Sequence, residues 1–168
     1  NICGGLIILT FKPFKVGHII EYEKYIGEVK SIELFYTRIK TAQNELVIIP
    51  NGLITNNEIR NMTKEKVRRL DLNINVSYNT DIRKVKEVLS EIIKEEVEGE
   101  DKLALKSPDP TIGVGELGAS AVIFYVYVYA KSENYLKLRM KLNEKIKIGF
   151  DENNIEIPYP QMDVHVSN

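Results

Sequence analysis

Residues 119–130 read Ala-Ser-Ala-Val-Ile-Phe-Tyr-Val-Tyr-Val-Tyr-Ala, which is the most apolar run in the chain. The run is shorter than the roughly 18–20 apolar residues that a helix needs to cross a bilayer. Side chains of a strand point alternately to opposite faces, so this pattern predicts a strand with one buried face. The apolar face would carry Val122, Phe124, Val126 and Val128. The opposite face would carry Ile123, Tyr125, Tyr127 and Tyr129.

The residues before this run predict a strand and then a helix. Residues 67–78 alternate between apolar and polar side chains, which is typical of a half-buried strand. Asn79-Thr80-Asp81 can cap the helix that follows, because their side-chain oxygens accept hydrogen bonds from free amide groups. Apolar residues recur along that helix at spacings of three and four: Ile82, Val85, Leu89, Ile92, Ile93 and Val97. The acidic residues at positions 95–101 are interpreted as a solvated helix end.

Further strands and a second helix are predicted from residue 111 to the end of the chain. Thr111–Val114 predicts a short strand, and Asn134 opens a second helix with apolar residues in register: Tyr135, Leu138, Leu142, Ile146 and Phe150. Further strands are expected around Ile155–Ile157 and at Met162–Val166. The order strand, helix, strand, strand, helix, strand is the ferredoxin-like arrangement, in which both helices would cover the Val122 face.

That arrangement leaves the row of Tyr125, Tyr127 and Tyr129 without a cover from this domain. The row could pack on the rest of the chain or on a neighbouring subunit. The alternative is a stacking platform for single-stranded nucleic acid, as in ferredoxin-like RNA-binding domains. Against it, the basic and glycine-containing motif of such domains is absent, and 23 Lys and Arg are balanced by 24 Asp and Glu. We therefore expect no nucleic-acid partner.

The first third of the chain predicts short strands joined by close-set turns. Five are expected, from Leu6–Phe11 to Leu46–Ile49, where Pro50-Asn51-Gly52 ends the last one. Such a pattern favours a small, strongly bent β-barrel, which would bury too little surface to be robust alone. Residues 51–63 are polar and rich in asparagine, and are interpreted as an interdomain linker.

No pattern of catalytic, metal-binding or cofactor-binding residues is visible. The chain has one cysteine, Cys3, and two histidines, His18 and His165, which excludes a multi-cysteine zinc site and makes a histidine metal centre improbable. Gly113-Val114-Gly115-Glu116-Leu117-Gly118 satisfies the dinucleotide-binding pattern, but a strand follows it where the pyrophosphate would need a helix amino terminus. The glycines are better explained by a bulge or bend. We expect no enzyme activity and no cofactor.

Several segments, in this order along the chain, resemble the small-conductance mechanosensitive channel (MscS) family. They are Asn1–Phe14, Lys15-Val16-Gly17, residues 41–45 (Thr-Ala-Gln-Asn-Glu), Pro50-Asn51-Gly52, Val67-Arg68-Arg69, Glu116-Leu117-Gly118-Ala119-Ser120 and residues 157–165 (Ile-Pro-Tyr-Pro-Gln-Met-Asp-Val-His). The resemblance spans essentially the whole chain, and its carboxy-terminal segment is the most specific part.

The resemblance implies an α+β protein that forms a homo-heptamer in a prokaryotic inner membrane, with this portion facing the cytoplasm. Such channels open under membrane tension and release ions and small osmolytes during hypo-osmotic shock. Residues 1–11 would end the pore-lining transmembrane helix, so the resemblance implies a helix where the pattern alone suggested a strand. Residues 12–61 would form an Sm-like (SH3-like) β-barrel domain, and residues 62–161 the ferredoxin-like α/β domain.

The resemblance also assigns the two ends of the chain to the assembly. The pore-helix end would comprise Asn1, Ile2, Cys3, Gly4 and Gly5. Residues 162–168 would give one strand to an intersubunit barrel through Met162, Asp163, Val164, His165, Val166 and Ser167. The tyrosine row would be an intersubunit or interdomain face. The membrane helices that precede the pore helix in the family, and through which it contacts the bilayer, would lie outside this chain.

Overall fold

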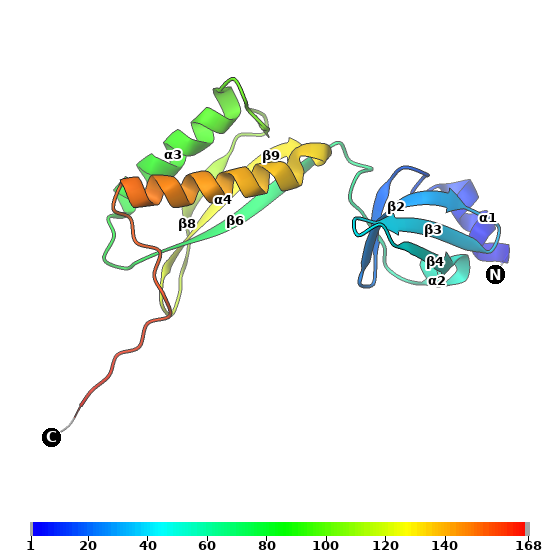
Figure 1. Ribbon diagram of the computed structural model, residues 1–168, viewed down its shortest axis with the longest axis horizontal. Helices are drawn as coiled ribbons and strands as arrows, with labels where there is room; N and C mark the ends of the chain where they lie inside the picture. The colour runs from blue at the N-terminus through cyan, green and yellow to red at the C-terminus, as the bar shows by residue number, and fades with distance from the viewer. Residues whose placement is uncertain (1, 167–168) are drawn as a thin grey trace. The chain divides into compact units, whose positions relative to one another are not determined.

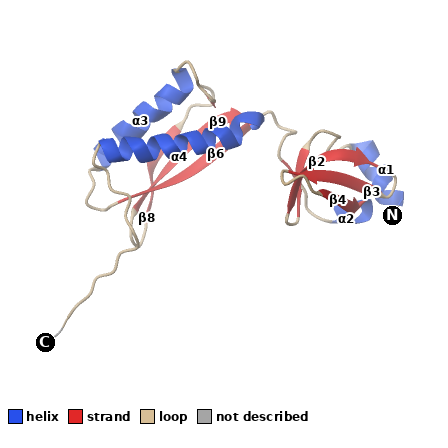
Figure 2. Cartoon of the chain, in the orientation of Figure 1, coloured by secondary structure: helices blue, strands red, loops and turns tan. Residues whose placement is uncertain are grey.

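The computed structural model describes residues 2–166, and the chain divides into two compact units, residues 1–66 and 67–168 (Figure 1). Each unit is a mixture of helices and antiparallel strands (Figure 2), so the expected α+β class is confirmed. Among the described residues, no helix combines the length and apolar character required to cross a membrane.

The second unit is built on the strand predicted from residues 119–130. β9 (Val122–Lys131) pairs along its whole length with β6 (Val67–Val76). Its other edge pairs with β8 (Thr111–Leu117) and, further along, with β7 (Ala104–Leu105). The ladder between β8 and β9 shifts register between Val114 and Glu116. The predicted bulge at the glycine-rich segment is therefore confirmed.

Two helices cover one face of this sheet, as predicted. They are α3 (Ile82–Glu98) and α4 (Tyr135–Glu152), the latter preceded by a 3-10 turn at Ser132–Asn134. The Asp81 side chain accepts a hydrogen bond from the Arg83 amide and caps α3. The core between helices and sheet includes the predicted strand face and the apolar stripes of both helices: Val122, Phe124, Val126, Val128, Val85, Leu89, Leu138, Leu142 and Phe150.

The strand predicted around Ile155–Ile157 is wrong. After α4 the chain turns through Asn154 (φ 54°), Ile155 is buried in the core, and the Ser77 amide donates a single backbone hydrogen bond to Glu156. Pro158 and Pro160 then remove two backbone donors, so a ladder cannot continue. Met162–Val166 also form no strand within this chain.

The first unit contains a five-stranded antiparallel sheet in the order β4-β3-β2-β1-β5. Its strands are β1 (Ile19–Tyr22), β2 (Tyr25–Ile32), β3 (Tyr36–Thr41), β4 (Leu46–Pro50) and β5 (Arg60–Asn61). Its helices are α1 (Ile2–Phe11) and α2 (Asn51–Asn56). The apolar start of the chain is thus helical, as the family resemblance implied and the local pattern did not.

The interpretation of residues 51–63 as a linker is wrong. Residues 51–56 form α2, and Arg60–Asn61 add a strand to the edge of β1. The apolar residues hidden in this polar segment explain the difference, because Ile54 is 3% exposed and packs in the core of the first unit with Ile8, Phe14 and Ile20.

The interpretation of residues 95–101 as a wholly solvated helix end is wrong at Glu96. Its carboxylate is 1% exposed and lies 2.8 Å from the ammonium groups of both Lys141 and Lys145 on α4. Glu96 lies three residues after Ile93 and seven after Leu89, so it shares the buried stripe of α3. Two cations compensate the burial of one carboxylate.

Candidate functional site

Helix α1 docks on the first unit through two glycines that leave no room for a side chain. A Cβ atom added to Gly4 would lie 2.7 Å from the Asn51 carbonyl carbon. A Cβ added to Gly5 would lie 2.0 Å from the Leu34 carbonyl oxygen, well inside contact distance. Both glycines are buried, and the next turn of α1 inserts Ile8 into the core at 1% exposure. We call this contact of α1 with Leu34 and Asn51 the helix joint.

Asn51 holds the strand side of the helix joint together. It is fully buried, and its Oδ1 accepts a hydrogen bond from the Thr37 hydroxyl at 2.8 Å. Its Nδ2 donates to the backbone carbonyls of Glu33 at 2.7 Å and Leu34 at 3.2 Å. Its own amide donates to the Phe35 carbonyl at 2.8 Å. One side chain thus fixes the β2–β3 turn on which Gly5 rests.

We expect Asn51→Ala to destabilise the first unit by about 2 kcal/mol, because the buried Thr37 hydroxyl and two turn carbonyls lose their partner. Urea unfolding measures this loss. Asn57→Ala is the matched control, since the Asn57 side chain is exposed, donates to the Leu53 carbonyl and contacts Tyr22, and its removal should cost less than about 1 kcal/mol. Equal losses for both variants would contradict the role of Asn51 in the helix joint.

The outward side of α1 is apolar and bare. Its exposed large apolar side chains are Ile2, Leu6, Ile7, Leu9 and Phe11, and Cys3 and Thr10 are exposed beside them. Of the predicted pore-helix residues, Gly4 and Gly5 lie in the helix joint, Ile2 and Cys3 are exposed, and Asn1 lies outside the described residues. A helix with one docked face and apolar side chains around the rest is expected to have a further apolar neighbour.

The predicted tyrosine row lies on the sheet face that the helices of its unit leave open. The rings of Tyr125 and Tyr127 stack with centroids 5.8 Å apart. Arg69 lies over the Tyr127 ring at 4.5 Å, and its guanidinium donates to both carboxylate oxygens of Asp71. Gly115 packs against the Tyr125 ring, where a Cβ would come within 2.3 Å. The structure brings the three tyrosines together, and what covers them stays a prediction.

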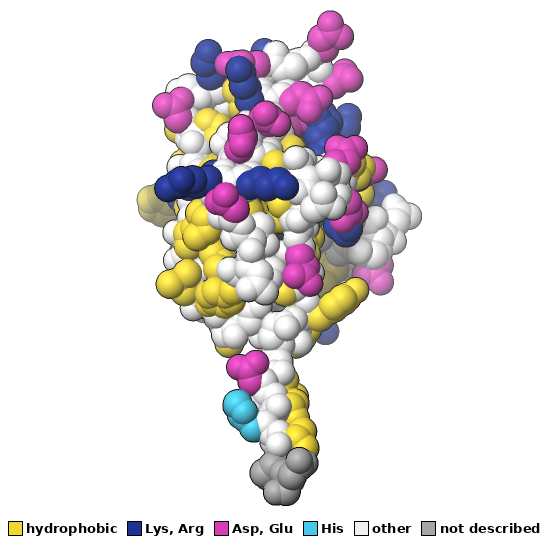
Figure 3. All heavy atoms as spheres, turned by 90° about the vertical axis from the view of Figure 1, so that its left-hand side faces the viewer, with side chains coloured by type: hydrophobic (Ala, Val, Ile, Leu, Met, Phe, Trp, Pro, Cys, Tyr) yellow, Lys and Arg dark blue, Asp and Glu magenta, His cyan; other side chains and the backbone are white. Residues whose placement is uncertain are grey.

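The tail after Gln161 is extended and exposed. The Gln161 amide donates to the Ser120 hydroxyl at 3.2 Å. Beyond it, Met162, Val164 and Val166 are each more than 70% exposed. Figure 3 shows hydrophobic side chains along one side of this tail and the charged and histidine side chains along another. Ser167 lies outside the described residues, and the intersubunit role of the tail stays a prediction.

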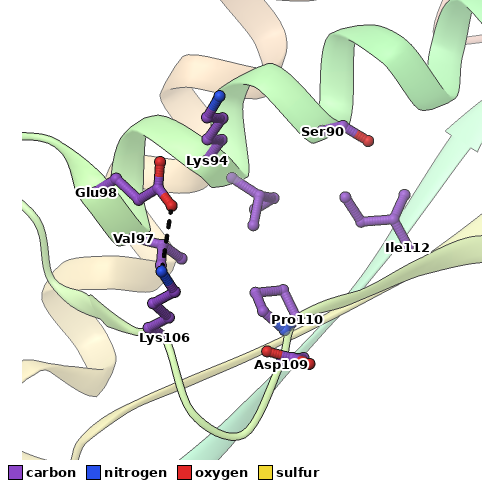
Figure 4. A pocket seen from close by; sticks show the side chains of 9 residues that line it. Ser90, Lys94, Val97, Glu98, Lys106, Asp109, Pro110 and Ile112 are labelled. Atoms are coloured by element: carbon purple, nitrogen blue, oxygen red, sulfur yellow. Dashed lines mark ion pairs between the residues drawn. The ribbon is translucent and has the colours of Figure 1, made fainter.

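A concave surface of the second unit lies between α3 and the loop before β8 (Figure 4). It encloses about 270 Å³, and Val97, Pro110 and Ile112 contribute to its apolar wall. Lys106 lies 3.7 Å from Glu98 at its rim. Among the residues that the structure describes, no group of three or more His, Cys, Asp or Glu side chains could hold a metal ion.

Two buried polar side chains, those of Asn51 and Glu96, have contacts that sequence motifs do not predict. Asn51 falls in the predicted strand-ending turn and in the predicted linker, and its buried side-chain contacts depend on Thr37 and the β2–β3 turn, which are distant in sequence. Glu96 was grouped with its acidic neighbours, although its place on the apolar stripe of α3 was a signal that could have separated it from them.

Family models match both units. The β-domain of the mechanosensitive ion channel family matches residues 1–64, and the MscS carboxy-terminal domain matches residues 70–157. The chain is 44% identical over 166 residues to an uncharacterised MscS family protein of Synechocystis, covering 99% of this chain and 54% of that protein. It is 34% identical to a small-conductance mechanosensitive channel of Edwardsiella ictaluri, covering 99% and 56%.

A solved structure shows the same relationship. The closed-state crystal structure of Helicobacter pylori MscS superposes with a TM-score of 0.89 at 32% identity, covering 99% of this chain and 64% of that one. The cryo-EM structure of Arabidopsis thaliana MSL1 has a TM-score of 0.72 at 18% identity, covering 95% and 58%, and shares the fold. The chain spans about half the length of the curated relatives it matches. It belongs to the MscS family of mechanosensitive ion channels.

Proposed function

We propose that this chain is the pore-helix end and the cytoplasmic cage portion of a homo-heptameric mechanosensitive channel in a prokaryotic inner membrane. The channel would open under membrane tension and pass ions and small osmolytes during hypo-osmotic shock. Family membership supports this proposal. The further membrane helices found in the family would precede the part described here and connect it to the bilayer.

The helix joint is the observation that carries the proposal for this chain. α1 exposes Leu6 and Phe11 at 61% and 78%, an arrangement suited to a helix that continues into an apolar environment. Its opposite side packs closely against the rest of the first unit at Gly4 and Gly5. A displacement of α1 would therefore move the strands that it contacts at the helix joint. The sheet of the first unit would in turn restrain α1.

The full-length protein tests the channel function in bacterial cells that lack their own mechanosensitive channels. We expect it to restore survival after hypo-osmotic shock and to give tension-activated currents in membrane patches. Lys147→Met is a control that should preserve both activities, because Lys147 pairs with Asp151 on α4 and both side chains are more than half exposed. A protein that reaches the membrane yet gives neither survival nor current would contradict the proposal.

The proposed tail barrel is tested by two variants that change opposite sides of the tail. Met162→Ser, Val164→Ser and Val166→Ser together should weaken self-association at least ~10-fold, because three apolar side chains per subunit would lose their burial. Asp163→Ser with His165→Ser alters the alternating positions and should have a smaller effect. Light scattering across a concentration series measures the assembly. Unchanged mass for the triple variant would exclude the tail from the interface.

A further inference from the structure

The side chain of Asn61 has a fixed orientation at the end of the first unit. Its Oδ1 accepts hydrogen bonds from the amides of Thr63 at 3.2 Å and Lys64 at 2.9 Å. Because the oxygen is used in this way, the Nδ2 group is the one that faces the loop after α1. There it donates to the Pro13 carbonyl at 3.2 Å and lies 3.0 Å from Nδ1 of His18.

A second donor meets the same ring nitrogen. The backbone amide of Lys15 donates to Nδ1 of His18 at 3.3 Å. With two N–H groups directed at it, Nδ1 must carry a lone pair, and the ring proton must be on Nε2. The structure thus requires a neutral imidazole in one tautomer. We call His18, Asn61 and their contacts with Pro13 and Lys15 the histidine clasp.

The histidine clasp joins two segments that are distant in the sequence. His18 and Lys15 belong to the loop that follows α1, whereas Asn61 lies in β5, just before the chain enters the second unit. Two other hydrogen bonds join nearby parts of the same segments, from the Ile19 amide to the Thr63 hydroxyl and from the Met62 amide to the Ile19 carbonyl, both at 2.8 Å. These two bonds do not depend on the charge of the imidazole.

We propose that the histidine clasp is an acid-sensitive latch: protonation of His18 breaks the contacts of its Nδ1 with the Asn61 side chain and the Lys15 amide. An imidazolium donates from both nitrogens, so a proton on Nδ1 would face two other N–H groups and both hydrogen bonds would be lost. The latch is therefore closed while the imidazole is neutral and opens when Nδ1 takes up a proton.

Cations predominate among the charged residues next to the histidine clasp in the sequence, where Glu65 is the acidic residue that follows Lys64. The loop carries Lys12 and Lys15, and Arg60 and Lys64 lie on either side of Asn61. The acidic groups of the adjacent strands are engaged elsewhere. Glu28 pairs with Lys30 at 2.7 Å on β2, and Glu21 on β1 pairs with Arg60 at 2.6 Å. No ion pair of His18 is recorded in the part of the chain that the structure describes.

This inference concerns the first unit alone and does not depend on the proposed channel function. It is tested on the chain of residues 1–168 by nitrogen-15 spectroscopy of the histidine rings and by hydrogen exchange at the Lys15 amide. At pH 8 we expect the Nε2–H tautomer at His18. Once the nitrogen-15 shifts show that the His18 ring is protonated, we expect the protection factor at Lys15 to have fallen about fivefold, the value for one net hydrogen bond.

Two variants separate the clasp from general effects of acid. His18→Asn places an amide oxygen near the position of Nδ1. This oxygen accepts hydrogen bonds but is not protonated, so protection at Lys15 should stay constant as the pH is lowered. His165→Asn, in the tail, removes the other histidine and should leave the wild-type pH response intact. An Nδ1–H tautomer in the neutral ring, or unchanged protection of the wild-type Lys15 amide when the His18 ring is protonated, would overturn the proposal.

Discussion

Gly5→Val is expected to release α1 from the first unit and to lower the free energy of unfolding of that unit by roughly 2–4 kcal/mol. The new Cβ would stand 2.0 Å from the Leu34 carbonyl oxygen, which belongs to backbone that Asn51 holds in place. The helix must therefore move, and Ile8 leaves the core with it. A helix as short as α1 is not stable in isolation, so its amides should also exchange freely.

Hydrogen exchange of residues 2–11 together with urea unfolding measures this effect. Gly113→Val is the matched control, because the same side chain is added in a strand where it meets no atom within 4 Å, and its stability should change by less than about 0.5 kcal/mol. Exchange in β6 and β9 gives an internal reference. Wild-type hydrogen-exchange protection across α1 in Gly5→Val would contradict this prediction, because it would show that the helix joint accommodates the larger side chain.

Replacing both Lys141 and Lys145 by Met should destabilise the second unit by about 3–5 kcal/mol. Glu96 is 1% exposed, and the double variant leaves its carboxylate in the core without a counter-ion. Adding Glu96→Leu should restore much of the loss, since a buried charge cluster replaced by apolar groups is often neutral in stability. Urea unfolding of the wild type, the double variant and the triple variant measures the loss and its recovery.

An exposed pair on the same helix provides the control for this cluster. Lys147 pairs with Asp151 one turn away, and both side chains are more than half exposed. Lys147→Met should therefore change stability by no more than about 0.5 kcal/mol. If Lys147→Met lowered the free energy of unfolding as much as the double variant does, the loss could not be assigned to the burial of Glu96.

The Glu96 cluster also predicts how acid affects the second unit. Burial alone would raise the pKa of Glu96, but hydrogen bonds and attraction from Lys141 and Lys145 outweigh it and hold the pKa below the ordinary value. A carboxylate with a lowered pKa stabilises the fold above its unfolded pKa of about 4.3, and that stability is lost as the pH falls further. Wild-type stability should fall below about pH 4. Glu96→Leu, combined with both lysine replacements, should flatten this part of the profile.

The sequence predicted the second unit well because its elements are long and strongly periodic. β6, α3, β9 and α4 each repeat their pattern several times, and the caps and faces follow from it. The first unit was harder because its elements are short. The run Leu6–Phe11 fits a helix or a strand equally well, and only the family resemblance favoured the helix. α2 was missed because its buried residues are few and lie among polar ones.

The candidate site was predictable only in part, for a physical reason. The tyrosine row follows from the two-residue period of one strand, so it could be read from one stretch of sequence. The helix joint depends on the absence of a side chain at Gly5, on a carbonyl at Leu34 and on an amide at Asn51. The close approach of Gly5 to the Leu34 carbonyl has no sequence signature, because any residue has a backbone carbonyl and a glycine can be needed for many reasons. Only the folded structure shows it.

The prolines at positions 158 and 160 give the stem of the tail a defined stiffness. Each fixes φ near −65°, so two of three consecutive residues have little freedom in any state of the chain. At about 3.1 Å per residue for an extended proline-rich segment, residues 156–161 form a strut of roughly 19 Å. The stem therefore has less backbone conformational entropy to lose on any association than a segment without proline. Met162 and the residues beyond it therefore follow a stem that has few accessible backbone conformations.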